Sequence, residues 1–159
     1  MATPAYQPEE LLAEERRLVI DRFDYDVLWW LGNRIRASAS ERKLPVAIHI
    51  THGLDNAFQT ILPGATADNL DWTRRKINAA YRYQHSSLYL RLCAERDGYD
   101  FNTRFRRPVA DYAASGGGLP LIVRHAGIVG AVAVSGLPDV EDHRLVVEAI
   151  DALIADHRK

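Results

Sequence analysis

Two pairs of short apolar segments, each pair separated by a few turn-forming residues, constrain this chain more than any other feature. In the first pair, apolar and other residues alternate over residues 46–51 and 58–62, with a polar, glycine-containing stretch at 53–56. In the second pair, residues 119–124 and 128–135 flank the sequence His-Ala-Gly. A period of two is typical of β-strands, and short polar connections are typical of hairpins. The sequence therefore predicts two β-hairpins.

Segments with helical spacing surround the two hairpins. Five helical stretches are expected, beginning near Glu9, Asp24, Asp68, Leu88 and Asp139. The three aspartates are candidate N-caps, because a short acidic side chain accepts hydrogen bonds from the free N–H groups of a first helical turn. The order of helix, hairpin, helices, hairpin and helix predicts an α/β (α+β) fold, with an antiparallel sheet of about four or five strands covered by helices.

The length of 159 residues fits one domain. Residues 1–8 contain Pro4 and Pro8 and little apolar pattern, so we expect a flexible arm there and a single domain over residues 9–159. Hydrophobic residues make up 47% of the chain, which is enough for a core. The formal net charge of -1 leaves no basic excess, so neither nucleic acid nor a membrane is expected as a partner.

Cysteine content and the first residues bear on the compartment. Cys93 is the only cysteine, so neither an internal disulfide nor a cysteine-rich zinc site is expected. Glu9 and Glu10 do not fit a secretory signal, and the longest apolar runs are much shorter than a membrane span. The sequence therefore predicts a cytoplasmic protein.

A run of three glycines, Gly116–Gly118, precedes the second hairpin. A phosphate-binding loop would follow a strand, open a helix and carry a lysine, so this run is not a P-loop or a dinucleotide fingerprint. Glycine allows backbone conformations that other residues avoid. The run is therefore either a tight turn or a pocket wall where a ligand approaches the backbone.

The segment Ser135–His143 joins an apolar strand to the start of the last helix. Such a junction offers free amide groups and the positive end of a helix dipole. Asp139 and Asp142 either satisfy those amides or act on a ligand. His143 is either a hydrogen-bonded structural residue or a functional one whose ring Asp142 orients.

Three consecutive cations, Arg74–Lys76, follow a helix start at Asp68. Neighbouring residues point to different sides of a helix, so at most two of these cations share a face. They either form salt bridges on the surface or recognise a carboxylate or phosphate. Ser86 and Ser87 lie further along the chain and either add hydroxyl donors or cap the next helix.

Metal and nucleophile signals are weak. His49 and His52 would not face the same side of a strand, and no acidic residue follows at the spacing of a zinc protease. The chain has no Gly-x-Ser-x-Gly elbow. Cys93 lies among leucines and is expected to be an inert core residue. No metal site is predicted.

A family resemblance rests on four blocks, which occur in this order: Leu62-Pro63-Gly64-Ala65-Thr66-x-Asp68-Asn69-x-x-Trp72-x-x-Arg75-Lys76, Ser86-Ser87, Gly116-Gly117-Gly118-Leu119-Pro120-Leu121, and Gly127-x-Val129-Gly130-x-Val132-x-Val134-Ser135-Gly136-Leu137-Pro138-x-x-Glu141-Asp142-His143. Over residues 10–155 the chain resembles the haem-degrading-domain family, also called GlcG- or HbpS-like. It is most similar to the compact, largely uncharacterised branch of that family. Leu119 departs from this branch, in which the position is usually aromatic.

The resemblance implies a profilin-like fold, in which a five-stranded antiparallel sheet has helices on both faces. It also implies a homo-oligomer, joined through sheet and helix surfaces. The apolar segment Val27–Leu31, with Trp29 and Trp30, fits a subunit interface, although burial in the core explains it equally well.

The resemblance implies a function only in outline. Some relatives bind haem, and others accompany diol or glycerol metabolism or a protein-targeting complex. Haem would need an apolar slot, an axial ligand and cations for its propionates. His143, or else His49 or His85, would supply the ligand, and Arg74–Lys76 would meet the propionates.

We therefore predict a homo-oligomeric protein that binds haem or another small anionic ligand. The pocket is expected between residues 68–76, 116–120 and 135–143. The expected ligand-binding residues are Asn69, Trp72, Arg75, Lys76, Ser86, Ser87, Gly117, Gly118 and Ser135.

Two alternatives stay open. The first is an enzyme for a small carboxylated or phosphorylated metabolite, in which Arg75 and Lys76 hold the anion, His143 is the acid or base and Asp142 orients it. The second is a non-catalytic assembly or adaptor protein with a large shared interface and no enclosed pocket.

Overall fold

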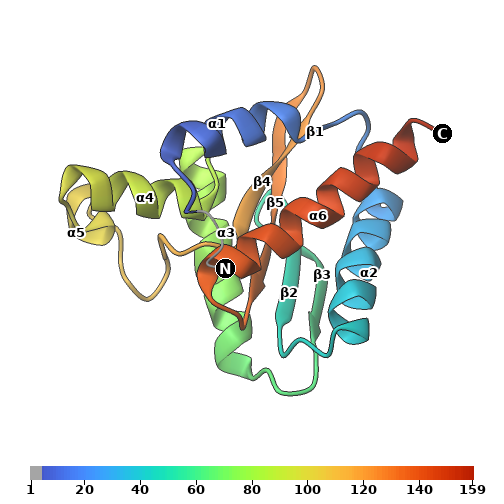
Figure 1. Ribbon diagram of the computed structural model, residues 1–159, viewed down its shortest axis with the longest axis horizontal. Helices are drawn as coiled ribbons and strands as arrows, with labels where there is room; N and C mark the ends of the chain where they lie inside the picture. Colours follow the sequence, from blue (N-terminus) through green and yellow to red (C-terminus); the bar gives the residue numbers. More distant parts are fainter. Residues whose placement is uncertain (1–4) are drawn as a thin grey trace.

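A computed structural model of the protein describes residues 5–159, in which helices pack against a central sheet (Figure 1). The elements are α1 (Pro8–Arg17), β1 (Val19–Ile20), α2 (Tyr25–Glu41), β2 (Ala47–His52), β3 (Asp55–Ile61), α3 (Ala67–Tyr83), α4 (Ser87–Asp97), α5 (Phe101–Phe105), β4 (Gly118–Val123), β5 (Gly127–Ser135) and α6 (Asp139–His157).

The two predicted hairpins are confirmed and form the centre of the sheet. β2 pairs antiparallel with β3, β4 pairs antiparallel with β5, and β5 also pairs antiparallel with β2. The strand order is β1-β4-β5-β2-β3, so β5 lies in the middle. Ser135, the last residue of β5, therefore lies at the end of a central strand.

The sheet is mixed, so the prediction of a purely antiparallel sheet is wrong in one pairing. β1 runs parallel to β4, with Val19 opposite Ile122. The helix predicted to begin near Glu9 ends at Arg17, and the backbone of Leu18 leaves the helical region, so Val19 begins a strand. Two residues are too few to show a period of two, so this strand gives no sequence signal of its own.

Helices cover both faces of the sheet, as the family resemblance implied. Ile48 and Val134 point toward α2 and α6 and belong to the main apolar core. Ala131 and Ala133 point to the other face, where they pack with Ile77 of α3. Small side chains on this face let α3 approach the sheet closely, which places Lys76 directly beside the end of β5.

Of the three aspartates predicted to be N-caps, Asp24 is one in the structure, and Asp68 and Asp139 are not. Asp24 caps α2 and accepts a hydrogen bond from the N–H of Val27 at 2.8 Å. α3 is capped instead by Thr66, through a capping box with Asn69, and α6 begins at Asp139 after Pro138. A capping box needs a polar residue three positions after the cap, and Asn69 fills that role here.

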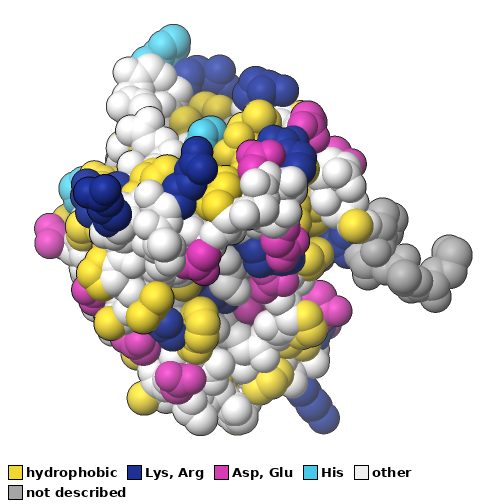
Figure 2. Space-filling model, turned by 90° about the vertical axis from the view of Figure 1, so that its left-hand side faces the viewer, with side chains coloured by type: hydrophobic (Ala, Val, Ile, Leu, Met, Phe, Trp, Pro, Cys, Tyr) yellow, Lys and Arg dark blue, Asp and Glu magenta, His cyan; other side chains and the backbone are white. Residues whose placement is uncertain are grey.

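The outer parts of the fold include one helix that the sequence did not predict, α5 (Figure 1). Around α4 and α5, cationic and anionic side chains are interspersed with hydrophobic ones (Figure 2).

The expected N-terminal arm is described only in part, because residues 1–4 lie outside the described part. Tyr6 donates a hydrogen bond to Glu14 at 3.1 Å, and Pro8 begins α1. No helix within residues 5–159 has the length and apolar character to cross a bilayer.

Candidate functional site

Two of the three predicted pocket segments meet around a polar cleft of about 270 Å³ at the carboxyl end of β5. The cleft, here called the Lys76 cleft, is lined by Asn69, Trp72, Lys76, Ser115, Ser135, Gly136, Leu137, Asp139 and Asp142. α3 supplies one wall, α6 supplies another, and the strand-to-helix junction forms the floor between them.

Lys76 and Asp142 form a buried ion pair in the wall of this cleft. The Nζ atom of Lys76 donates hydrogen bonds to the backbone oxygen of Val134 at 3.0 Å and to Oδ2 of Asp142 at 3.1 Å. The two side chains are only 3% and 1% exposed. Oδ1 of Asp142 accepts a further hydrogen bond from the N–H of Leu137 at 3.0 Å, which fixes the carboxylate at the start of α6.

Burial shifts both members of the pair toward their neutral forms. Loss of hydration raises the pKa of Asp142 from 3.8 to about 6, although the nearby Lys76 opposes that rise. The same loss of hydration lowers the pKa of Lys76, against the attraction of Asp142. A low-dielectric environment disfavours any charged form, so the proton of this pair is held less firmly on nitrogen than it would be in water.

The glycine run packs behind Lys76 and does not itself line the cleft. Gly117 has φ +130°, and a Cβ there would lie 2.4 Å from the Val134 oxygen and 2.9 Å from Nζ of Lys76. A Cβ on Gly118 would lie 2.8 Å from the backbone oxygen of Lys76. The N–H of Gly118 donates to Oγ of Ser87 at 2.9 Å. Only glycine permits so close an approach to α3.

His143 lies apart from the cleft even though it follows Asp142 in the sequence. Its ring is buried, with Nε2 2.6 Å from Oε1 of Glu14 in α1 and with the Tyr6 ring 5.3 Å away. Successive residues of a helix point in directions about 100° apart, so Asp142 and His143 contact different neighbours. The structure brings Asp142 to Lys76 and His143 to α1.

The two arginines before Lys76 contact other parts of the protein. Arg75 stacks on Trp72, with its guanidinium carbon 3.7 Å from the ring centroid, and donates to the oxygen of Val109 at 3.2 Å. Arg74 binds Asp71 and Asp111. Both arginines therefore fasten the segment after α5 to α3, and Arg75 supports the cleft only through Trp72.

Ser86 lies outside the cleft and caps α4. Its Oγ accepts a hydrogen bond from the N–H of Tyr89 at 3.2 Å, and its own N–H donates to Oε1 of Glu15 at 2.7 Å. This is one of the two roles that the sequence left open for it.

A second concave surface lies between α1, the edge of the sheet and the turn before α4. This groove of about 600 Å³, here called the His85 groove, is lined by Leu12, Glu15, Arg16, Val19, His85 and Ile122. Nδ1 of His85 lies 2.8 Å from Oε2 of Glu15, and Nε2 makes no hydrogen bond within residues 5–159. His49 and His143 are buried inside the fold, whereas His85 is partly exposed.

Comparison with known proteins places the chain in a family. Residues 23–151 match the model of the family described as haem degrading protein HbpS-like. The chain belongs to the HbpS-like family. It is 43% identical to a UPF0303 protein of Rhizobium meliloti (strain 1021) over 145 residues, which cover 91% of this chain and 88% of that protein.

Solved structures of other proteins share the fold of this chain. The crystal structure of the Ybr137w protein has a TM-score of 0.88 and 28% identity, and the match covers 98% of this chain and 92% of that one. A crystal structure described as a PduOC:heme complex has a TM-score of 0.70 and 17% identity, covering 82% and 94% of the two chains. The second likeness shows the fold alone.

The expected ligand-binding residues did not include two polar residues that line the Lys76 cleft of this HbpS-like chain, Ser115 and Asp139. Ser115 lines it directly, and its position before the glycine run was the available signal. Asp139 also lines it, held by Arg91 at 2.5 Å and by the N–H of Gly116 at 2.9 Å. Nothing in the sequence links Arg91 to Asp139, which lie 48 positions apart.

Proposed function

We propose that this HbpS-like protein binds a small ligand carrying a carboxylate or phosphate in the Lys76 cleft. The observation that carries the proposal is the buried ammonium of Lys76 at the wall of a polar cleft. Its two hydrogen bonds leave one of its three N–H groups without a partner in residues 5–159. The hydroxyls of Ser115 and Ser135 supply further donors for an anion.

The protonation state of Asp142 should set the net charge of the cleft and therefore its affinity for an anion. When Asp142 is ionised, it neutralises Lys76, and Asp139 is neutralised by Arg91. When Asp142 is protonated, the cleft gains one positive charge, which favours an anion. Because the pKa of Asp142 is raised to about 6, anion affinity should increase as the pH falls from neutral toward that value.

Calorimetric titration with glycolate, pyruvate and inorganic phosphate tests the proposal. Binding to the wild type should tighten by up to about tenfold per pH unit between pH ~7.5 and ~6. Lys76→Met should abolish it, whereas Lys43→Met, which removes an exposed lysine, should leave it unchanged. Circular dichroism verifies that both variants fold. Equal binding by the two variants would contradict the proposal.

Haem is a second candidate ligand, favoured by the shape and chemistry of the His85 groove. The groove is larger than the Lys76 cleft, and Leu12, Val19 and Ile122 give it an apolar wall. His85 offers Nε2 as an axial ligand, with Nδ1 held by Glu15, and Arg16 offers a cation for a propionate. These residues fit haem, which when bound would supply a redox-active iron. The PduOC:heme neighbour supports this candidate.

Titration with haemin separates this candidate from the first. A saturable Soret shift should appear in the wild type, disappear in His85→Ala and persist in His125→Ala, a control on an exposed turn histidine. Retention of the shift in His85→Ala would rule out His85 as the axial ligand and the His85 groove as the haem site. Neither result affects binding at the Lys76 cleft, because the two sites share no lining residue.

We also propose that the protein self-associates through the side of α2 that borders β3. Trp29 and Tyr25 are 63% and 65% exposed there, beside a strand that forms an edge of the sheet. Trp30, in contrast, packs against the core. Light scattering should show an oligomer that Trp29→Ser disrupts and that Val109→Ser, at an equally exposed apolar residue elsewhere, does not. A monomeric wild type would contradict this.

A further inference from the structure

The environment of Lys76 is unusual for a lysine of this chain. The sequence contains three lysines, Lys43, Lys76 and Lys159, and the first and last are exposed. Lys76 is almost fully buried, yet its side chain forms part of the lining of a cleft. A desolvated lysine beside a proton acceptor is the form in which the amine acts as a nucleophile toward carbonyl groups.

The partner of Lys76 is placed to receive its proton. Oδ2 of Asp142 lies 3.1 Å from Nζ, within reach of direct proton transfer. Burial lowers the pKa of Lys76 and raises that of Asp142 to about 6, so moving a proton from nitrogen to oxygen costs less here than in water. The product of that transfer is a neutral amine beside a carboxylic acid. The Val134 oxygen, 3.0 Å from Nζ, continues to orient the amine.

The cleft has room for a small carbonyl compound next to this amine. A Cβ on Gly117 would lie 2.9 Å from Nζ, so glycine at this position lets the Lys76 side chain pack against the turn behind it. The cleft borders Lys76 on the side of Trp72, Ser115 and Ser135. The hydroxyls of Ser115 and Ser135 make no hydrogen bond within residues 5–159 and are available to a carboxylate. The volume of about 270 Å³ lies below the usual range for drug-sized ligands and suits a metabolite of a few carbon atoms.

We propose that Lys76 forms a Schiff base with a small 2-oxo acid bound in the Lys76 cleft. The Nζ lone pair attacks the carbonyl carbon, and the carbonyl oxygen takes the proton held by Asp142. The nitrogen then returns a proton to Asp142, which passes it to the departing hydroxyl. The neutral amine, protonated Asp142 and one carbonyl thus give one protonated imine, one ionised Asp142 and one water, with no oxidant or reductant. The inference rests on the proposed function, because the carboxylate of the ligand must first bind in the cleft.

Reductive trapping tests this step on the intact protein. The wild type is incubated with pyruvate and sodium cyanoborohydride, and the modified site is located by peptide mass spectrometry. A single adduct is expected on Lys76, formed much faster than any adduct on Lys43 or Lys159, which act as controls within the same molecule. Asp142→Asn should slow trapping by at least about a hundredfold. Lys76→Arg, which keeps a cation but has no primary amine, should give no adduct there.

The outcomes separate this inference from the proposed function. Pyruvate that binds by calorimetry but is not trapped would overturn the Schiff base and leave the ligand site standing. If pyruvate, glycolate and phosphate all fail to bind and no adduct forms, both proposals fall. Equal labelling of all three lysines would also overturn the Schiff base, since it would show only surface chemistry. Trapping on Lys76 at an unchanged rate in Asp142→Asn would overturn the proton-transfer role of Asp142.

Discussion

The Nζ atom of Lys76 in α3 lies 3.1 Å from Oδ2 of Asp142 in α6, and both side chains are buried. The pair thus joins the helix on one face of the sheet to the start of a helix on the other, around the end of β5. Each charge compensates the other, because both side chains are largely shielded from hydration by water. Removing either one leaves the other without a counter-charge in the interior.

Asp142→Ala should therefore lower the free energy of unfolding by about 1–3 kcal/mol at neutral pH, because it leaves the Lys76 ammonium and the N–H of Leu137 without their buried hydrogen-bond acceptor. The double variant Lys76→Met with Asp142→Leu should recover much of this loss, since it removes both charges and keeps apolar volume. Urea denaturation of the three proteins provides the measurement. A double variant as unstable as the single one would show that packing, and not charge, sets the cost.

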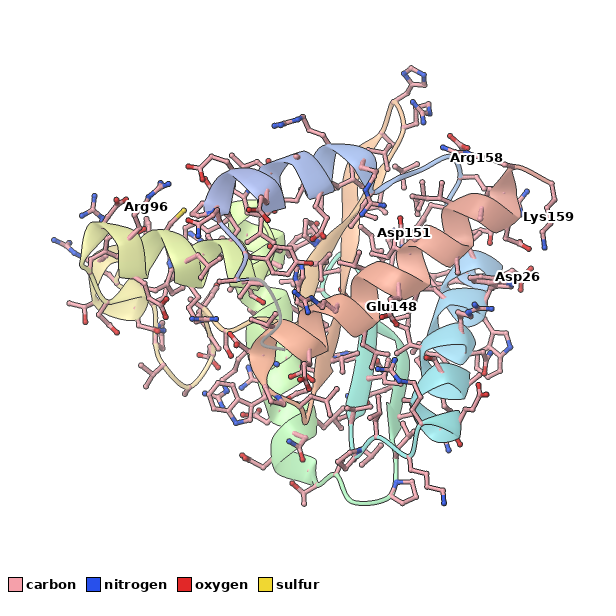
Figure 3. The ribbon with its side chains drawn as sticks, viewed as in Figure 1. Asp26, Arg96, Glu148, Asp151, Arg158 and Lys159 are labelled. Carbon is pink, nitrogen blue, oxygen red and sulfur yellow. The ribbon has the colours of Figure 1, made fainter. Side chains whose placement is uncertain are left out.

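A surface ion pair on the same helix provides the control for this result. Glu148, which is labelled on α6 in Figure 3, is 60% exposed. It lies 3.3 Å from Arg42 at the end of α2. Exposed pairs contribute little because water screens them, so Glu148→Ala should change stability by less than about 1 kcal/mol.

Asp142 should also make stability depend on pH in an unusual direction. Its pKa rises from 3.8 to about 6 on folding, so between these values the folded protein holds more protons than the unfolded chain. The stabilisation that the Asp142 carboxyl group contributes is therefore complete below pH ~4 and is lost as the pH rises through about 6. The free energy of unfolding should change by about 3 kcal/mol over this range.

The difference between wild type and Asp142→Asn isolates this contribution, because all other titrations are shared. Urea denaturation at intervals between pH ~4 and ~7 should show the stability of the wild type falling relative to that of the variant. Parallel curves for the two proteins across this range would mean that the Asp142 pKa is close to its ordinary value.

The close approach of the glycine run to α3 gives a prediction that needs no ligand. Gly117→Ala would place a methyl group 2.4 Å from the Val134 oxygen at φ +130°, so it should cost about 2–4 kcal/mol. Gly98→Ala is the matched control. Gly98 also has positive φ, at +72°, but nothing lies within 4 Å of an added Cβ, so only the backbone penalty of about 1 kcal/mol applies. Equal losses in denaturation experiments would contradict the crowding at Gly117.

The sequence predicted the strands that are long enough to show a local pattern of apolar residues. Alternation predicted β2 and β3. The continuous apolar run over residues 128–135 predicted β5, and such a run is typical of a strand buried on both faces. β1 has two residues, and its pairing with β4 depends on a contact between segments about a hundred positions apart. No local pattern encodes such a pairing, so the one parallel contact of the sheet was missed.

The site was predictable to the level of segments but not of side-chain directions. Asn69, Trp72, Lys76 and Ser135 do meet in one cleft. The direction of His143 depends on where α1 docks, and α1 is positioned by Glu14 and Glu15, far away in the sequence. Side-chain partners that are distant in sequence decide which of two adjacent helix residues faces a site.

The docking of α1 supplies the last prediction. Glu14 is the partner of Nε2 of His143 at 2.6 Å, and Nδ1 of that ring is buried without a hydrogen bond in residues 5–159. Glu14→Ala would leave both ring nitrogens unsatisfied, so it should cost about 1–3 kcal/mol and loosen α1. Hydrogen exchange should speed up over residues 8–17 in this variant. Glu10→Ala, at an exposed position of the same helix, should lose less than about 1 kcal/mol and keep its protection. If α1 exchanged equally in both variants, its attachment would depend on the apolar contacts of Leu11 and not on the Glu14–His143 pair.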